Sequence, residues 1–265
     1  MKHISSINNP ELKLLRLLFQ KSRERKKQQR FVIEGEREIL KAIRGEYKFE
    51  SVYICKGSET HFSSLLSSML STKINLVEPS VFDQLGIRSG SEKIIAVAQS
   101  KIHELKDLNI SRKSLILVVE APEKPGNIGA LYRTAAAAKM DAVIIANPKT
   151  DFYNPNSIRS SLGSIFLLPT AIAPSYKVIS FLKEKKFDIA TAAINKNAIR
   201  YDLFDYKTPC ALVMGTESSG LDDLWMKSTN QHLIIPMDKT IDSLNLSVSA
   251  GILMYEAKRK NNLIE

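Results

Sequence analysis

Continuous apolar runs in the second half of the chain place the strongest constraint on its fold. The runs LILVV, AVIIA, DIATAA, CALVMG and LIIP follow one another between Leu115 and Pro236, with helix-like segments between several of them. A strand that is apolar at every position is typical of a parallel sheet whose two faces are both covered by helices. The sequence therefore predicts an α/β fold with a mostly parallel sheet.

A smaller α/β series precedes this sheet. The short apolar runs FVI, SVYI, INLV and IIAVA are interspersed there with helix-like segments such as EREILKAI. The stretch from Ser100 to Ser114 is polar and has no strong period, which is typical of a connection between domains. We predict a small N-terminal α/β domain over residues 1–100, a linker over 101–114 and a larger α/β domain over 115–265.

Positive charge gathers near the N-terminus. The chain has 38 Lys and Arg against 28 Asp and Glu, a formal net charge of +10, and eight of the basic residues fall from Lys13 to Arg30. Asn9-Pro10 predicts a helix start here, because Pro is favoured in the first helical turn. Apolar residues recur at helical spacing: Leu14, Leu15, Leu18 and Phe19. Clustered cations attract polyanions, so an RNA or DNA contact and a solvated charged helix both stay open.

The composition also argues against several classes of protein. No run of about 18 apolar residues is present to cross a bilayer, and MKHISSINNP lacks the apolar core of a signal peptide. We therefore expect a cytoplasmic protein without a membrane anchor. Cys55 and Cys210 lie far apart inside apolar runs, which favours buried, reduced thiols over a disulfide or a zinc site. No metal site is predicted.

Three loops in the second half share one design, in which an apolar strand ends, a polar or glycine-containing stretch follows and a helix begins. They are PGNIGALYRTAAAA from Pro125, VMGTESSGL from Val213 and IIPMDKTIDSLNLSVSAG from Ile234. Ligands of open α/β sheets bind beyond the carboxyl ends of the strands, so we expect the loops to converge on one pocket. Their glycine spacing matches neither G-x-G-x-x-G nor a P-loop, which argues against a nucleotide held by those devices.

These loops carry side chains that can form hydrogen bonds with a polar ligand: Asn127, Arg133, Glu217, Ser243 and Asn245. Arg133 follows Asn127 by six residues, so the two side chains can flank one site at a helix start. A lone arginine in a small, apolar helix typically contacts an anion or a carboxylate. A purely structural role stays open for Asn127 as a cap, Glu217 as a solvated residue and Ser243 as a cap.

The final segment reads as a helix that begins after Ser243, which stands in the N-cap position. Its apolar residues recur on one predicted face: Leu244, Val248, Gly251, Ile252 and Tyr255. Basic residues from Lys258 to Lys260 suit the negative end of the helix dipole.

The three loops resemble the signature motifs of the SpoU family of RNA ribose 2′-O-methyltransferases, a branch of the knotted SPOUT enzymes. PGNIGALYRTA resembles motif one, MGTESSGL motif two and IPMDKTIDSLNLSVSAGILMYEAKRK motif three, and SIRSSLGSIFLLP between them is also similar to the family. NPELKLLRLL and RFVIEGEREI resemble the small substrate-binding domain of members that act on ribosomal RNA. Ser218 and Lys239 depart from the family, which often has glycine at both positions.

The resemblance implies a trefoil-knotted C-terminal domain that binds S-adenosyl-L-methionine against backbone groups at Gly215, Ile235 and Leu244. It implies catalytic roles for the hydrogen-bonding side chains named above and a homodimer formed through the last helix. The implied reaction is methylation of a ribose 2′-hydroxyl in structured RNA, with 23S ribosomal RNA favoured by the N-terminal domain. The alternatives are a transfer RNA ribose methyltransferase, a base methyltransferase and a non-catalytic RNA-binding or ribosome-assembly factor.

Overall fold

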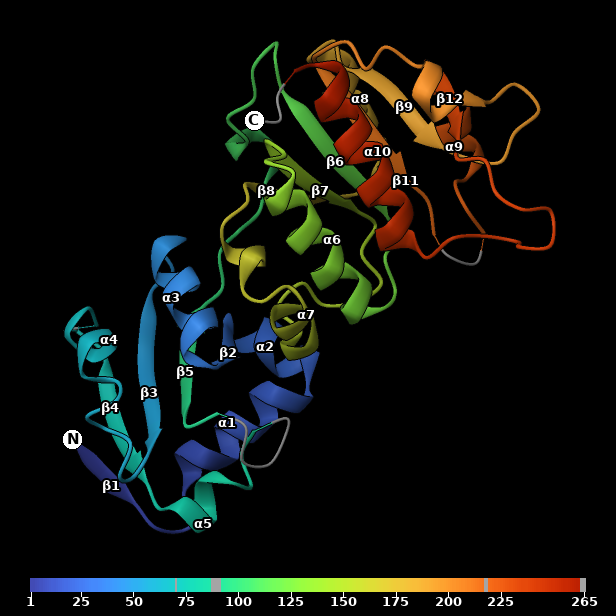
Figure 1. Cartoon of the computed structure of the whole chain (residues 1–265). Helices are drawn as coiled ribbons and strands as arrows, with labels where there is room; N and C mark the ends of the chain where they lie inside the picture. Colours follow the sequence, from blue (N-terminus) through green and yellow to red (C-terminus); the bar gives the residue numbers. More distant parts are fainter. Residues whose placement is uncertain (70, 87–91, 217–218, 263–265) are drawn as a thin grey trace. The chain divides into compact units, whose positions relative to one another are not determined.

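The computed structural model describes residues 1–69, 71–86, 92–216 and 219–262 of the chain. These residues form two compact units (Figure 1): Met1–Ile102 together with Asp151–Leu167, and His103–Thr150 together with the chain from Leu168 onward. Each unit contains a sheet of its own. Among the described residues, no helix is long and apolar enough to cross a membrane.

The first unit is built on a five-stranded sheet with the strand order β1-β4-β3-β5-β2. Its strands are β1 (Lys2–Ile4), β2 (Arg30–Glu34), β3 (Phe49–Cys55), β4 (Lys73–Val77) and β5 (Ile94–Gln99). Strands β1, β4 and β3 run parallel, whereas β5 is antiparallel to both β3 and β2. Its helices are α1 (Pro10–Gln20), α2 (Ser22–Gln28), α3 (Glu36–Arg44), α4 (Ser63–Ser67), α5 (Pro79–Phe82) and α7 (Pro155–Ser160), with a 3₁₀ turn at Ser164–Phe166. The buried side of α1 packs on the sheet in one apolar core.

The basic N-terminal segment folds as two helices, not as the single amphipathic helix that the sequence predicts. Helix α1 starts as expected, since the Asn9 side chain accepts a hydrogen bond from the Glu11 amide at 2.9 Å. It ends because Lys21 adopts an extended backbone, with φ −116° and ψ 110°, before α2 begins. The buried side chains of α1 are Leu12, Leu15 and Leu18, while Leu14 and Phe19 are only partly buried.

Arg25 lies inside the protein instead of on the basic surface. Arg25 is only 3% exposed. Its Nε donates a hydrogen bond to Asp151 Oδ2 at 2.5 Å, and its Nη1 donates one to the Leu18 carbonyl at 2.7 Å. A buried guanidinium needs such acceptors to replace water, and here they tie the end of α1 to the segment that begins at Asp151. The other cations of α1 and α2 are exposed, and so is Lys21 between the two helices. They are Lys13, Arg16, Arg23, Lys26 and Lys27.

The segment Asp151–Leu167 packs within the first unit, although it stands inside the predicted C-terminal domain. The Tyr153 ring stacks on Phe31 with centroids 4.2 Å apart, and the Phe166 ring lies 5.8 Å from Phe31. A Cβ on Gly45 would lie 2.2 Å from the Phe166 carbonyl oxygen, so glycine permits this close approach. Contacts between aromatic residues far apart in the chain leave no periodic signal, and the sequence did not predict this packing.

The predicted linker is also packed. From His103 onward the chain belongs to the second unit, where the His103 carbonyl accepts a hydrogen bond from the Ile172 amide at 2.8 Å. A 3₁₀ turn at Leu105–Asp107 follows, and Leu108 is buried in the core of that unit. A few apolar residues therefore fix a stretch that reads as polar overall.

The second unit holds a seven-stranded sheet with the order β10-β12-β9-β11-β6-β7-β8, in which every pairing is parallel. Its strands are β6 (Leu115–Glu120), β7 (Ala142–Ala146), β8 (Thr170–Ala173), β9 (Asp188–Ala192), β10 (Ile199–Arg200), β11 (Cys210–Met214) and β12 (Gln231–Ile234). Its helices are α6 (Pro125–Ala137), α8 (Ser175–Glu184), α9 (Asp223–Met226) and α10 (Leu246–Lys260), with a 3₁₀ turn at Tyr201–Leu203. The predicted parallel α/β sheet is confirmed.

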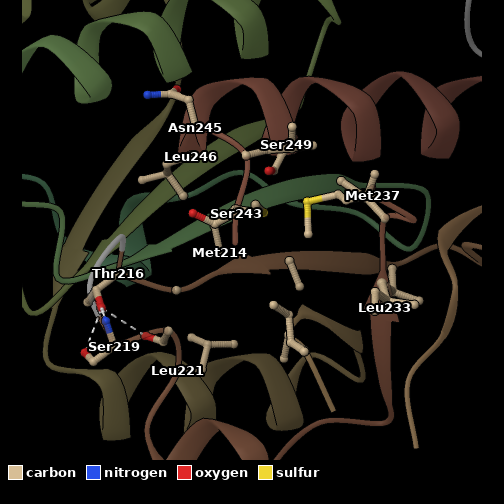
Figure 2. A pocket seen from close by; sticks show the side chains of 18 of the residues that line it. Met214, Thr216, Ser219, Leu221, Leu233, Met237, Ser243, Asn245, Leu246 and Ser249 are labelled. Carbon is tan, nitrogen blue, oxygen red and sulfur yellow. Dashed lines mark hydrogen bonds between the residues drawn. The ribbon is translucent and has the colours of Figure 1, made fainter. Parts of the chain in front are cut away.

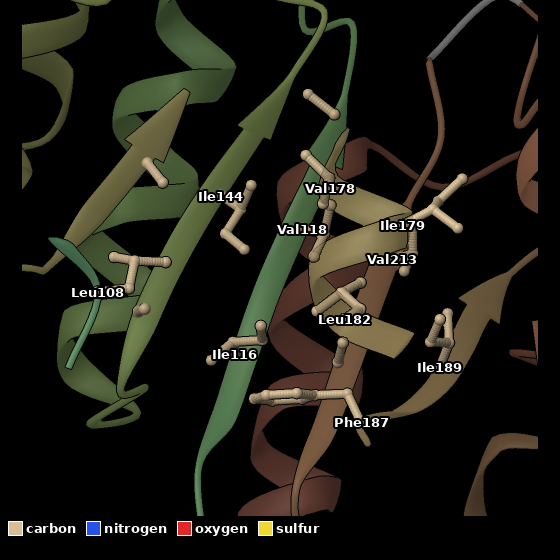
Figure 3. Packing of buried hydrophobic residues seen from close by; sticks show 14 of the residues in the cluster. Leu108, Ile116, Val118, Ile144, Val178, Ile179, Leu182, Phe187, Ile189 and Val213 are labelled. Carbon is tan, nitrogen blue, oxygen red and sulfur yellow. The ribbon is translucent and has the colours of Figure 1, made fainter. Parts of the chain in front are cut away.

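Helices cover both faces of this sheet, which explains why its strands are apolar at every position. Helix α8 packs on one face (Figure 3), in a core that includes Ile116, Val118, Ile144, Val178, Ile179, Leu182 and Val213. Helices α6 and α10 lie side by side on the other face (Figure 1), where a Cβ on Gly251 would be 3.4 Å from Thr134 Cγ2. Cys55 and Cys210 are both buried and free, as predicted.

The start of α10 corrects the prediction for Ser243. The helix begins at Leu246, and Asn245 is its N-cap, because the Asn245 side chain accepts a hydrogen bond from the Ser247 amide at 2.9 Å. Ser243 therefore lies in the loop before the helix and is not the cap.

The buried face of α10 also differs from the predicted one. The buried apolar residues are Leu246, Ala250, Leu253, Met254 and Ala257. Val248 and Tyr255, which belong to the predicted apolar face, are 51% and 43% exposed. Large apolar residues therefore lie on both sides of α10, with Leu253 and Met254 buried and Val248 and Tyr255 exposed.

Candidate active site

A cavity of about 570 Å³ lies in the second unit, beyond the carboxyl ends of β9, β11 and β12 (Figure 2). The strand ends contribute Ala192, Met214 and Leu233 to its wall, and the first turns of α10 contribute Leu246 and Ser249. Open parallel sheets bind ligands at this position. The volume is in the range of pockets that hold small organic molecules.

Two glycines shape the loop after β11. A Cβ on Gly215 would lie 2.5 Å from the carbonyl carbon of Gly220, so this approach requires glycine. Gly220 itself has φ +67°, a left-handed backbone that favours glycine. The Thr216 amide donates to the Gly220 carbonyl at 2.9 Å and the Gly220 amide donates to the Thr216 carbonyl at 3.2 Å, which closes the loop. Glu217 and Ser218 fall within it and lie outside the described residues.

The loop after β12 forms a second part of the wall. Ile235 lines the cavity directly after the strand, and Ser243 and Leu244 line it directly before α10. Between them, Asp238 accepts hydrogen bonds from the Thr240 amide at 2.9 Å and from the Thr240 hydroxyl at 2.6 Å. These bonds favour the charged carboxylate and lower the pKa of Asp238 below its ordinary value. The loop is thus held in a defined turn by its own side chains.

The two loops and the helix start bring most of the predicted site residues to one cavity. The predicted residues that line it are Gly215, Ile235, Ser243, Leu244 and Asn245. The sequence pattern did not indicate a role for the apolar residues of the same loops, among which Met214, Met237 and Leu221 also line the cavity (Figure 2). All three belong to the loops predicted from the sequence, so their place in these loops was the available signal.

Asn127 reaches the edge of this cavity through Asn245. The Asn245 Nδ2 lies 3.5 Å from Asn127 Oδ1, a long hydrogen bond that joins the start of α6 to the start of α10. The Asn127 Nδ2 is buried and has no hydrogen-bond partner among the described residues. A buried amide donor without a partner is costly in a folded protein, so this atom suits a ligand group that accepts a hydrogen bond.

Arg133 does not line the cavity of its own chain. It lies on α6, six residues and about 9 Å along the helix axis from Asn127. Its side chain is exposed and makes no hydrogen bond or ion pair with the residues that the structure describes. Within one chain, the predicted pairing of Asn127 and Arg133 at a single site is therefore not observed.

Among the residues that the structure describes, metal-ligating side chains do not gather at this cavity. No group of three or more His, Cys, Asp or Glu side chains is positioned to hold a metal ion in the described part of the chain. Among the described residues that line the cavity, the polar side chains carry hydroxyls or, in Asn245, an amide.

Two family models match separate parts of the chain. The model described as the SpoU rRNA Methylase family matches residues 114–255, which include every strand of the second unit. The model described as the MRM3-like substrate binding domain matches residues 9–96 of the first unit.

Similar proteins cover the whole chain. The 23S rRNA (guanosine(2553)-2′-O)-methyltransferase RlmP of Bacillus subtilis is 29% identical over 260 residues, which make up 97% of this chain and 100% of that protein. A solved RNA 2′-O ribose methyltransferase is 33% identical, with a TM-score of 0.83 over 98% of this chain and 100% of the other. An rRNA methyltransferase from Sinorhizobium meliloti with bound AdoMet has a TM-score of 0.92 at 24% identity, covering 100% and 99% of the two chains, and confirms the fold.

Proposed function

Because the chain belongs to the SpoU rRNA methylase family, we propose that it methylates a ribose 2′-hydroxyl in 23S ribosomal RNA. It is a methyltransferase that uses S-adenosylmethionine. The single observation that carries the proposal is the cavity at the carboxyl ends of β9, β11 and β12, lined by residues of two of the predicted motifs and bordered by the third. The B. subtilis relative that matches along its full length is named for 23S ribosomal RNA, which supports this class of substrate.

The residues around the cavity fit S-adenosylmethionine. Its adenosine needs an apolar slot with backbone hydrogen-bonding groups, and the wall combines Met214, Leu233 and Leu246 with the closed glycine loop. A side chain at Gly215 would fill the space against Gly220, so the loop keeps its backbone close to the cavity. We assign the binding of the cofactor to backbone groups at Gly215, Ile235 and Leu244.

When bound, S-adenosylmethionine supplies an electrophilic methyl group, while the ribose hydroxyl is a poor nucleophile. The protein must therefore hold the hydroxyl in line and stabilise the charge that develops on its oxygen. Arg133 offers a planar fork of donors for that oxygen or for a neighbouring phosphate. We assign the orientation of the ribose to Asn127, Ser243 and Asn245, and a hydrogen-bonding role to Glu217, which lies outside the described residues.

A homodimer is part of this proposal. The outward side of α10 and the loop before it expose apolar side chains, with Ile241 53%, Val248 51% and Tyr255 43% exposed. Exposed apolar groups that gather on one element often mark a protein interface. We propose that α10 packs against a second copy of the chain, and that this contact brings Arg133 of one chain to the cavity of the other. The trefoil knot implied by the family belongs to the same proposal.

The first unit is proposed to bind the RNA. Six cations of the segment from Lys13 to Lys27 are exposed, and their charge suits a phosphate backbone. The match of residues 9–96 to a substrate-binding model supports the same role. Ribosomal RNA as substrate goes with a cytoplasmic location, which we include in the proposal.

The test is a map of 2′-O-methylation across the ribosomal and transfer RNAs of the native host, with and without the gene. We expect one ribose methyl group to disappear from 23S ribosomal RNA. Loss of a methyl group from a transfer RNA would replace the proposed substrate, and an unchanged map would favour a non-catalytic RNA-binding factor. Nuclease digestion and mass spectrometry of the nucleosides would detect methylation of a base instead of ribose.

A further inference from the structure

A buried carboxylate stands at the carboxyl end of β6, next to the site but outside it. Glu120 is the last residue of β6 and is 6% exposed. No Lys or Arg forms an ion pair with it among the residues that the structure describes. A carboxylate removed from water without a cation destabilises a protein unless hydrogen bonds replace its hydration.

Three donors from three other elements provide those hydrogen bonds. The indole Nε1 of Trp225 donates to Glu120 Oε2 at 2.7 Å, and the Ser175 hydroxyl donates to the same oxygen at 2.5 Å. The Asn147 Nδ2 donates to Glu120 Oε1 at 3.1 Å. Trp225 belongs to α9, Ser175 begins α8, and Asn147 follows β7. The Glu120 side chain therefore joins three segments that follow β7, β8 and β11.

The hydrogen bond to Trp225 connects Glu120 with a segment that borders the cavity. Trp225 is fully buried in the core beneath α9, and the residue after it, Met226, lines the cavity. Helix α9 stands between the two loops that form the wall, since Leu221 of the first loop precedes it and Leu233 follows it. With only four residues, α9 is too short to be stable on its own. Its position depends on what anchors it.

We propose that Glu120 is a positioning residue for the cofactor site, because its carboxylate fixes the indole of Trp225 and thereby the α9 segment between the two cofactor loops. Ser175 and Asn147 serve the same carboxylate from elements that do not line the cavity. Ser175 and Asn147 provide hydrogen bonds for the charged carboxylate. The indole of Trp225 links the carboxylate to the wall of the cavity. The inference rests on cofactor binding in this cavity and is independent of which RNA is methylated.

The experiment compares two donors of the same carboxylate. Trp225→Phe removes the indole N–H, and Ser175→Ala removes the hydroxyl donor while leaving α9 untouched. The affinity for S-adenosylmethionine is measured by titration calorimetry on the full-length protein without RNA, well below the melting temperature, and the melting temperature is measured on the same samples. Both variants should have a lower melting temperature than the wild type.

Only Trp225→Phe should weaken the binding of S-adenosylmethionine. If α9 is correctly placed in about a tenth of the molecules, the apparent Kd rises about tenfold, whereas Ser175→Ala should stay within about twofold of the wild type. An unchanged Kd in Trp225→Phe, or an equal rise in both variants, would overturn the proposal. A wild-type protein that does not bind S-adenosylmethionine would instead count against the proposed function.

Glu120→Gln keeps the test decisive if Trp225→Phe does not fold. The amide keeps the volume of the carboxylate but turns one acceptor into a donor. Trp225 is the single tryptophan of the chain, so quenching of its fluorescence by acrylamide reports on α9 alone. Glu120→Gln should increase quenching and raise the Kd about tenfold. Unchanged quenching or an unchanged Kd would refute the link.

Discussion

Arg133 is the residue on which the proposed chemistry depends most, yet it stands away from the cavity of its own chain. Arg133→Ala should lower the single-turnover rate by a factor on the order of a hundred or more, as the loss of a donor to a developing oxyanion does. Cofactor affinity should stay close to that of the wild type, because the side chain does not line the cofactor cavity. Arg133→Lys should recover little, since a point charge cannot replace a planar fork of donors.

The control for this prediction is Arg112→Ala, which removes another exposed arginine from the same unit. Its rate and melting temperature should match those of the wild type. Single-turnover kinetics on the RNA and calorimetry with the cofactor separate the two effects. A correctly folded Arg133→Ala protein with full activity would remove Arg133 from the reaction.

At the level of elements, two neighbouring substitutions on α2 separate the structural role of the basic segment from its proposed role in RNA binding. Arg25→Ala leaves the buried Asp151 carboxylate without its partner, which should lower the free energy of unfolding by about 3–5 kcal/mol. Lys26→Ala removes an exposed cation and should change that free energy by no more than about 0.5 kcal/mol. It should weaken RNA binding and reduce the slope of log K against log salt by about one. Urea unfolding and binding titrations at several salt concentrations measure both, and an RNA effect confined to Arg25→Ala would contradict the proposed surface.

The elements that the sequence predicts well are those whose signal is local. The apolar runs of β6, β7 and β11 identify buried strands because both faces of the sheet are covered. The inner face of α10 could not be predicted, since apolar residues lie on both sides of the helix: Leu253 and Met254 are buried, whereas Val248 and Tyr255 are exposed. The packing of Tyr153 on Phe31 depends on contacts that no local pattern encodes. The candidate site follows the same rule, because its loops could be located from the motifs while the distance of Arg133 from the cavity could not.

For the whole molecule, the exposed apolar side of α10 predicts a dimer. Tyr255→Glu places a charge at a residue that is 43% exposed and should shift the protein toward monomer, because an unpaired charge in an interface is strongly unfavourable. Tyr176→Glu, at a residue that is 58% exposed on α8, is the matched control and should leave the oligomeric state unchanged. Light scattering over a range of concentrations gives the result. A wild-type protein that is monomeric at micromolar concentration would rule out the dimeric site.

Mixed dimers test whether one chain completes the site of the other. Arg133→Ala and Gly215→Val should each be inactive, the first for lack of the arginine and the second because a side chain at Gly215 collides with Gly220. If Arg133 serves the cavity of the partner, a hybrid dimer has one site in which both the arginine and the cofactor loop are intact. Random mixing makes half of the dimers hybrids, each with one of two sites restored, so the mixture should recover about a quarter of wild-type activity. If Arg133 acts within its own chain, both sites of every hybrid lack one component and the mixture stays inactive. Denaturing and refolding the two variants together, with each refolded alone as the control, distinguishes these arrangements.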